Sequence, residues 1–240
     1  LGFRVVVPGE INPAGADRQG AAFCYPVELA HGFAAALIEA QPDYVFLPHI
    51  RGVPSNSGQE NSCTCVFVQG EPYYLRSAFP ELDSPRTLSP YFDFTDGIAD
   101  SKAAFQELAA ALGAASQRFE QAFQSAIAAQ NRFQAELAAL GQQALAALRE
   151  DPDRMAVVLF GRPYNSFAAE ANKGIPNKFV TRGLPIIPYD MLPAEGEPLD
   201  DDHNMYWGVG RMILRAAQYV ARHPQLFSVY ISNFSCGPDS

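Results

Sequence analysis

Three absences in the sequence exclude whole classes of function. No apolar run reaches the ~18–20 residues that a membrane-spanning helix requires, so we expect no membrane segment. Lys and Arg are few and scattered: 17 basic against 26 acidic residues give a net charge of -9. Because phosphate binding needs clustered positive charge, we expect no nucleic-acid partner. No secretory signal peptide is visible, which indicates a cytoplasmic protein. The chain starts at Leu1 rather than Met, so we also expect it to be a fragment of a longer protein.

Cysteine is scarce as well, with four residues in 240: Cys24, Cys63, Cys65 and Cys236. An even number could form two disulfides, but nothing marks a secreted chain, and a protein of this length folds without covalent cross-links. We therefore expect reduced thiols. Their spacing matches no compact metal signature such as paired CxxC motifs.

What is present is the composition of a globular protein, 48% hydrophobic and 18% charged,. Strands are predicted over 3–8, 43–50, 155–163, 184–193 and 227–234. Helices are predicted over 26–40, 72–79, 170–183 (interrupted near 174–176) and 204–223. Alternation of strand and helix implies right-handed βαβ units with parallel sheets. The expected fold class is α/β, with two Rossmann-like lobes over residues 1–97 and 151–240.

Residues 98–150 differ from both lobes, because they are rich in Ala, Gln, Glu and Leu and contain no Pro. Gly113 and Ser116 indicate a break. The apolar positions fall mostly three or four residues apart: Phe119, Phe123, Ile127, Phe133, Leu137, Leu140, Leu145 and Leu148. This pattern predicts an inserted helical hairpin whose second arm is long. Its apolar face would pack on the two lobes or on another subunit, as in a homodimer; a solvated spacer helix is the alternative.

The cysteines stand where α/β folds place ligand sites. Cys24 lies at a loop-to-helix junction and Cys236 at the end of a strand, while Cys63 and Cys65 follow the loop after strand 43–50. In parallel sheets, ligands gather outside the carboxyl ends of the strands. Thiolates brought together there suit a soft metal or an iron–sulfur cluster, and a helix N-terminus favours the thiolate form. The alternative is that these residues are small buried hydrophobes.

Other polar residues are weaker candidates. Arg162 and Asn165, in "LFGRPYN", could hold a CoA phosphate or a carboxylate at a strand-to-helix turn; alternatively, Arg162 caps a loop or pairs with an acid. Asp190 is expected to cap the following turn. His31 and His49 are expected to be hydrogen-bonded structural residues rather than ligands or proton carriers.

Eight blocks of sequence carry a resemblance that covers nearly the whole chain and is weakest over 98–150. They are "CYPVELAHG" (24–32), "DYVFLPHI" (43–50), "CVFVQGEPY" (65–73), "LFGRPYN" (159–165), "GIPNKF" (174–179), "YDMLP" (189–193), "MYWGVGRMILRAA" (205–217) and "SNFSCGPDS" (232–240). In this order they resemble the activase-related region, a domain of unknown function, of large 2-hydroxyacyl-CoA dehydratase/activase-like proteins.

This resemblance implies an oxygen-sensitive, anaerobic system. In such a system an ATP-hydrolysing activase passes one low-potential electron to a dehydratase-type component, whose cluster is held by three cysteines. The open iron of that cluster can bind the carbonyl oxygen of an acyl-CoA. Carried onto this sequence, the resemblance implies a [4Fe–4S] cluster on Cys24, Cys65 and Cys236, with Cys63 as a bystander or alternative ligand. The implied partners are an ATP-dependent activase domain, other domains of the same large chain, and an acyl-CoA.

The sequence departs from the family pattern at two positions, where Glu28 replaces an expected Lys and Val66 an expected Pro. No GxxxxGK loop is present, so we expect no ATP hydrolysis by this chain alone. Two other functions are compatible with the sequence. One is a non-catalytic interaction module of a multidomain protein, and the other is a domain that binds CoA esters without a cluster.

Overall fold

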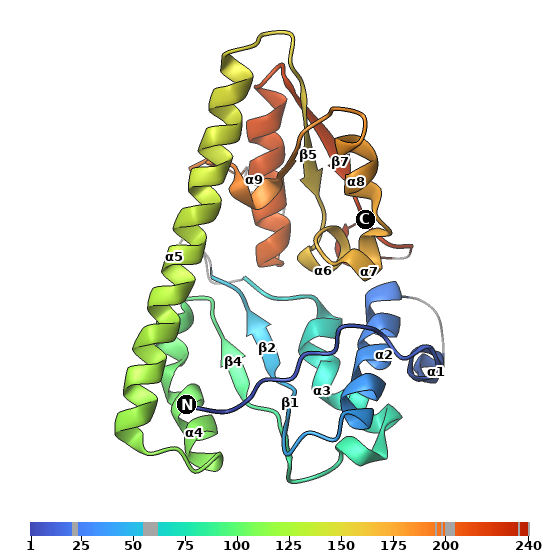
Figure 1. Ribbon diagram of the computed structural model, residues 1–240, viewed down its shortest axis with the longest axis vertical. Helices are drawn as coiled ribbons and strands as arrows, with labels where there is room; N and C mark the ends of the chain where they lie inside the picture. Colours follow the sequence, from blue (N-terminus) through green and yellow to red (C-terminus); the bar gives the residue numbers. More distant parts are fainter. Residues whose placement is uncertain are drawn as a thin grey trace. The chain divides into compact units, whose positions relative to one another are not determined.

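The computed structural model describes residues 1–20, 24–54, 62–194, 196–197, 199, 205–234 and 236–239. It is a mixed α/β fold in which short parallel sheets alternate with helices (Figure 1). The chain divides into two compact units, Leu1–Ile127 and Ala128–Ser240, called unit 1 and unit 2 below. The division falls within the long helix α5 (Ser116–Arg149).

Unit 1 contains two pairs of short parallel strands and the helices that flank them. Its elements are α1 (Pro13–Ala16), η1 (Asp17–Gln19), α2 (Tyr25–Glu39), β1 (Val45–Phe46), β2 (His49–Gly52), α3 (Val66–Ala78), η2 (Pro80–Leu82), β3 (Thr87–Leu88), β4 (Tyr91–Asp93), η3 (Ile98–Ser101), α4 (Lys102–Ala111) and the first part of α5. Strand β1 pairs with β3 and β2 with β4, both in parallel. Parallel pairing was therefore predicted correctly for this region.

The strand predicted over residues 3–8 is wrong. This segment has no regular secondary structure, and Val5 and Val7 are 81% and 79% exposed. A β-branched run favours extended backbone, but a strand also needs hydrogen bonds from a neighbour. Among the described residues, no strand pairs with this segment.

Helix α2 follows the prediction for 26–40 closely. Pro26 lies in its first turn, where a fixed φ and a missing N–H cost the helix nothing,. Its inner face meets α3 in one core cluster of unit 1, formed by Ala34, Leu47, Leu75, Phe79 and Leu82. This cluster packs the second half of α2 against the second half of α3.

Helices α4 and α5 occupy the stretch between the predicted lobes, with a turn at Gly113, whose φ of +73° suits glycine,. Phe119 and Phe123, near the start of α5, pack with Ala109 of α4. Along the same helix, Phe133 and Leu140 are 54% and 52% exposed.

Unit 2 is built on a three-stranded parallel sheet of order β6-β5-β7. Strands β5 and β7 are labelled in Figure 1. After the end of α5 its elements are β5 (Ala156–Phe160), α6 (Pro163–Ser166), α7 (Ala169–Asn172), α8 (Ile175–Val180), β6 (Ile186–Pro188), η4 (Tyr189–Met191), α9 (Gly208–Ala221), β7 (Leu226–Tyr230) and η6 (Gly237–Asp239). Central strand β5 is buried along its whole length. Its side chains at Ala156, Val158 and Phe160 form the core with α9 and the last turns of α5.

Two glycines in unit 2 allow close backbone contacts. A Cβ at Gly141 of α5 would collide with the carbonyl group of Met191, so glycine lets α5 approach η4. Gly161, at the end of β5, has a φ of +135°, and a Cβ there would collide with the Ile231 carbonyl oxygen and the Ser166 hydroxyl. Gly161 thus brings the segment after β7 against the end of β5.

Candidate functional site

Two of the four cysteines stand at the starts of neighbouring helices in unit 1. Cys24 is the N-cap residue of α2, and Cys65 is the N-cap residue of α3. The free N–H groups and the dipole of a helix N-terminus attract negative charge, and both thiols lie at such an end.

The thiols of Cys24 and Cys65 are close enough to influence each other. Cys65 is buried and Cys24 is half-buried. Burial raises the pKa of the Cys24 thiol above its ordinary value, a hydrogen bond from the Val27 backbone lowers it, and the charge of Cys65 raises it further. The structure thus brings together two thiols from segments that are well separated in the sequence.

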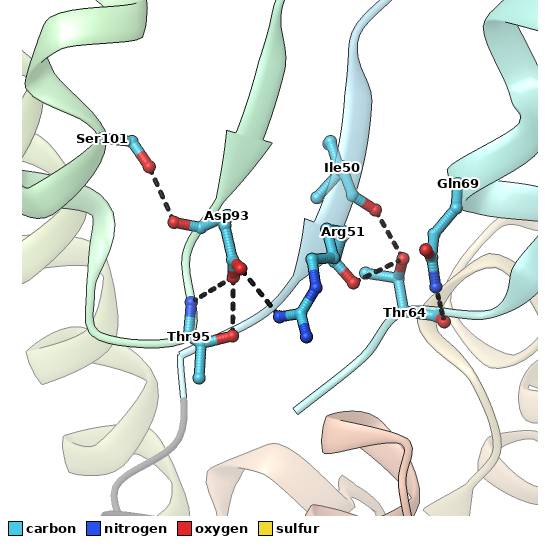
Figure 2. Close-up of polar contacts among 7 residues, drawn as sticks. All are labelled: Ile50, Arg51, Thr64, Gln69, Asp93, Thr95 and Ser101. Carbon is cyan, nitrogen blue, oxygen red and sulfur yellow. Dashed lines mark hydrogen bonds and ion pairs between the residues drawn. The ribbon is translucent and has the colours of Figure 1, made fainter. Parts of the chain in front are cut away.

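Thr64 fixes the loop that carries Cys63 and Cys65 (Figure 2). Its backbone N–H donates to the Arg51 carbonyl oxygen at 2.7 Å, and its hydroxyl donates to the Ile50 carbonyl oxygen at 2.5 Å. The Gln69 side chain of α3 donates to the Thr64 carbonyl oxygen at 2.9 Å. The loop is therefore tied both to the end of β2 and to the first turns of α3.

Cys63 has a different neighbour from Cys65. The Arg51 guanidinium pairs with the Asp93 carboxylate at 2.7 Å (Figure 2). The hydrogen bond and the charge of Asp93 raise the pKa of Arg51, and the charge of Cys63 adds to this. Cys63 therefore lies within electrostatic range of Arg51 at the carboxyl end of β2, whereas Cys65 lies near Cys24.

The Asp93 carboxylate is itself held in place at the end of β4 (Figure 2). It accepts hydrogen bonds from the Thr95 N–H at 3.1 Å and from the Thr95 hydroxyl at 2.6 Å. Burial raises the pKa of Asp93, but the hydrogen bonds from Thr95 and Arg51 outweigh it, so the pKa lies below its ordinary value. The carboxylate is thus charged and fixed at neutral pH.

Cys236 belongs to unit 2, directly before η6. Its half-buried thiol has a pKa raised to about 11, first by burial and then by the negative charge and hydrogen bonding of Asp239. This thiol is therefore protonated at neutral pH.

Arg162 lies at the end of β5 and contacts the segment that carries Cys236. Its Nε donates to Asp239 at 2.8 Å, its Nη2 donates to the Pro238 carbonyl oxygen at 3.0 Å, and both charged side chains are 2% exposed. The Ser232 hydroxyl donates to the other carboxylate oxygen of Asp239 at 2.8 Å. Arg162 therefore pairs with an acid, one of the two roles considered for it, and this pairing anchors the turn after Cys236.

The other polar residues singled out from the sequence lie in both units. Asn165 is buried in α6, and its side-chain N–H₂ group has no hydrogen-bond partner among the described residues. Asp190 lies in η4, and burial raises its pKa. His31 is buried and its Nδ1 lies 2.7 Å from the Val27 carbonyl oxygen. His49 contacts Tyr73, with its Nδ1 3.4 Å from the hydroxyl oxygen.

Sequence reasoning missed Thr64 and Asp239, which position cysteine segments, and Asp93, which pairs with Arg51. Thr64 stands between the two cysteines of a C-x-C motif, a signal that was available but unspecific. Asp93 and Asp239 pair with arginines that lie 42 and 77 residues away in the sequence. No local sequence pattern indicates such pairs.

Within the described ranges, no three His, Cys, Asp or Glu side chains lie together in a group that could hold a metal ion. No helix in the described part of the chain is both long and apolar enough to cross a membrane.

No curated protein and no solved structure shows significant similarity to the chain. The family described as "CoA enzyme activase uncharacterised domain (DUF2229)" matches residues 1–192. With most of its length covered, the chain belongs to this family of CoA enzyme activase-related domains.

Proposed function

We propose that this domain binds a [4Fe–4S] cluster and acts in low-potential electron transfer or reductive chemistry of a CoA enzyme system. The proposed ligands are Cys24 and Cys65 of unit 1 and Cys236 of unit 2. The observation that carries the proposal is the pair of interacting thiols at the starts of α2 and α3. Membership of the CoA enzyme activase-related family supports it.

The chemistry of this donor pair fits a cluster. Thiolates are the usual protein ligands of iron–sulfur clusters, and two helix N-termini stabilise negative charge on them. Because burial raises the pKa of Cys24, we expect cluster binding to release protons from the thiols. When bound, a cluster with three protein ligands supplies one-electron transfer and an open iron for a substrate oxygen.

Two side chains of α3, Glu71 and Tyr74, lie where burial disfavours negative charge. Burial raises the pKa of Glu71, on α3. Burial also raises the pKa of Tyr74, and the charges of Glu71 and of both cysteines raise it further. The Tyr74 phenol therefore remains neutral, so it adds no repulsion to a site that gathers thiolates.

The proposed partners follow from the same family. An ATP-dependent activase domain would deliver the electron, and an acyl-CoA is the proposed substrate class. Arg162 is not proposed as a CoA contact, because its guanidinium is engaged by Asp239 and Pro238.

The deciding experiment is anaerobic reconstitution followed by iron and sulfide analysis. We expect about four irons per chain and absorbance near roughly 400 nm, as [4Fe–4S] proteins show. Cys24→Ala, Cys65→Ala and Cys236→Ala should each lose the cluster, whereas the matched control Cys63→Ala should retain it. Stoichiometric zinc without iron, or an unchanged cluster in all three variants, would contradict the proposal. Absence of iron with firm binding to neighbouring domains would favour a non-catalytic interaction module.

A further inference from the structure

Unit 1 contains a cavity of about 320 Å³ between η1, α2 and α3. It is lined by Arg18, Gln19, Val27, His31, Phe67, Tyr74, Ser77 and Ala78. This volume is at the lower end of the range for small-molecule sites, and the mixture of apolar walls with a few polar groups is typical of them.

The positive charge in the cavity wall belongs to Arg18. Its Nη1 donates to the Ala78 carbonyl oxygen at 3.2 Å, and its guanidinium carbon lies 4.7 Å from the centre of the Phe79 ring. These two contacts hold the guanidinium without neutralising it. Among the described residues, no carboxylate forms an ion pair with Arg18. The other N–H groups of its planar fork therefore suit a carboxylate.

Two further lining residues offer hydrogen-bond acceptors. The Gln19 amide N–H₂ donates to the Cys24 carbonyl oxygen at 3.4 Å, which fixes the amide orientation. Its Oε1 is buried and has no partner in the described part of the chain. The Nδ1 of His31 lies 2.7 Å from the Val27 carbonyl oxygen and therefore carries a proton. In the tautomer with its single proton on Nδ1, Nε2 is an acceptor.

The rest of the wall is flat and apolar. The rings of His31 and Tyr74 are stacked, with centroids 5.3 Å apart and an interplanar angle of 17°. Phe67 supplies a third aromatic ring, and Val27 and Ala78 complete the lining. Aromatic walls of this kind pack favourably against a planar ring.

We infer that this cavity binds a small aromatic carboxylate. The carboxylate pairs with Arg18, the ring packs against Phe67 and Tyr74, and an O–H or N–H substituent donates to Gln19 or His31. The inference goes beyond the proposed cluster and does not depend on it, because no cysteine lines the cavity.

The test uses the full chain and benzoate, with binding followed by saturation-transfer NMR and isothermal titration calorimetry. Acetate, which lacks the ring, and benzyl alcohol, which lacks the charge, serve as comparison ligands. We expect saturable binding of benzoate and much weaker binding of the other two. Arg18→Met should weaken benzoate binding by about 10- to 100-fold, the usual effect of losing a charge-assisted hydrogen bond.

Two more variants make the test specific. Ser77→Phe fills the cavity from an exposed position of α3 and keeps every charge, so it should also abolish binding. Arg86→Met removes an exposed arginine elsewhere in unit 1 and should leave binding unchanged. The inference is overturned if benzoate shows no saturable binding, if acetate or benzyl alcohol binds equally well, or if Arg18→Met or Ser77→Phe binds like the wild type.

Discussion

At the residue scale, the ion pair between Arg162 and Asp239 has the largest consequence for stability. Both side chains are 2% exposed, and removing one partner leaves a buried charge uncompensated. We predict that Arg162→Met lowers the free energy of unfolding of unit 2 by about 3–5 kcal/mol. Urea unfolding followed by Trp207 fluorescence measures this, because Trp207 is the single tryptophan of the chain.

The control for this prediction is the pair between Arg222 and Glu197, in which Arg222 is 59% exposed. Arg222→Met should cost only about 0–1 kcal/mol, as exposed pairs do. An equally large loss in both variants would contradict the role assigned to burial.

The stability that Arg162→Met loses depends on pH, and this dependence follows from the pKa of Asp239. Burial raises the pKa of Asp239, but hydrogen bonds from Arg162 and Ser232 and the charge of Arg162 lower it below its ordinary value. A carboxylate with a lowered pKa stabilises the folded state above its unfolded pKa of about 3.9. This stability is lost as the pH falls through the lowered value. The difference between wild type and Arg162→Met should therefore be largest near neutral pH and shrink in acid.

The sequence could place the cysteines near helix starts and strand ends, but it could not separate Cys63 from Cys65. The difference arises from the loop around Thr64, whose hydrogen bonds tie it to β2 and α3. These bonds leave Cys63 near Arg51 and Cys65 near Cys24. The distinction between Cys63 and Cys65 depends on tertiary contacts, which the spacing of residues along the chain does not reveal.

At the element scale, glycines inside two helices have opposite roles. Gly141 of α5 faces the Met191 carbonyl group, and a Cβ there would collide with it. Gly70 of α3 has only a Tyr74 ring atom near its Cβ position, at 3.8 Å. We predict that Gly141→Ala destabilises unit 2 by about 1–3 kcal/mol, as overpacking does. Gly70→Ala should instead stabilise α3 by up to about 1 kcal/mol, because alanine has the higher helix propensity.

Thermal and urea unfolding of both glycine variants, followed by circular dichroism, tests the pair. A stabilising Gly141→Ala would show that α5 does not need its close approach to η4. A destabilising Gly70→Ala would show that propensity does not decide the outcome in α3.

Elements with strong periodicity were predictable, and short strands were not. Helix α2 lies within one residue of its predicted bounds, because its apolar positions and Pro26 gave independent signals. The predicted strand 43–50 is divided into β1 and β2 around Pro48, which lacks the N–H that a ladder requires,. Residues 3–8 have strand composition but no partner strand in the described structure. Strand pairing is a long-range property, so composition alone overestimates it.

At the scale of the whole molecule, the proposed ligands are divided between the two units. Cys24 and Cys65 belong to unit 1, whereas Cys236 belongs to unit 2. The Cys65 segment is anchored within unit 1 by Thr64, and the Cys236 segment within unit 2 by Arg162 and Asp239. Because each anchor lies within one unit, each segment can keep its local conformation independently of the other unit.

This independence predicts two unfolding transitions rather than one. Phe92 is buried in unit 1, with its ring centroid 4.3 Å from that of Phe105. Phe92→Ala should destabilise unit 1 by about 3–5 kcal/mol and shift the circular dichroism curve, while the Trp207 fluorescence midpoint stays in place. Arg162→Met should instead destabilise unit 2 and lower the Trp207 fluorescence midpoint, while the transition of unit 1 stays in place. If fluorescence and circular dichroism instead coincide in the wild type and move together in both variants, the chain unfolds as a single cooperative unit, and the independence of the two anchors is refuted.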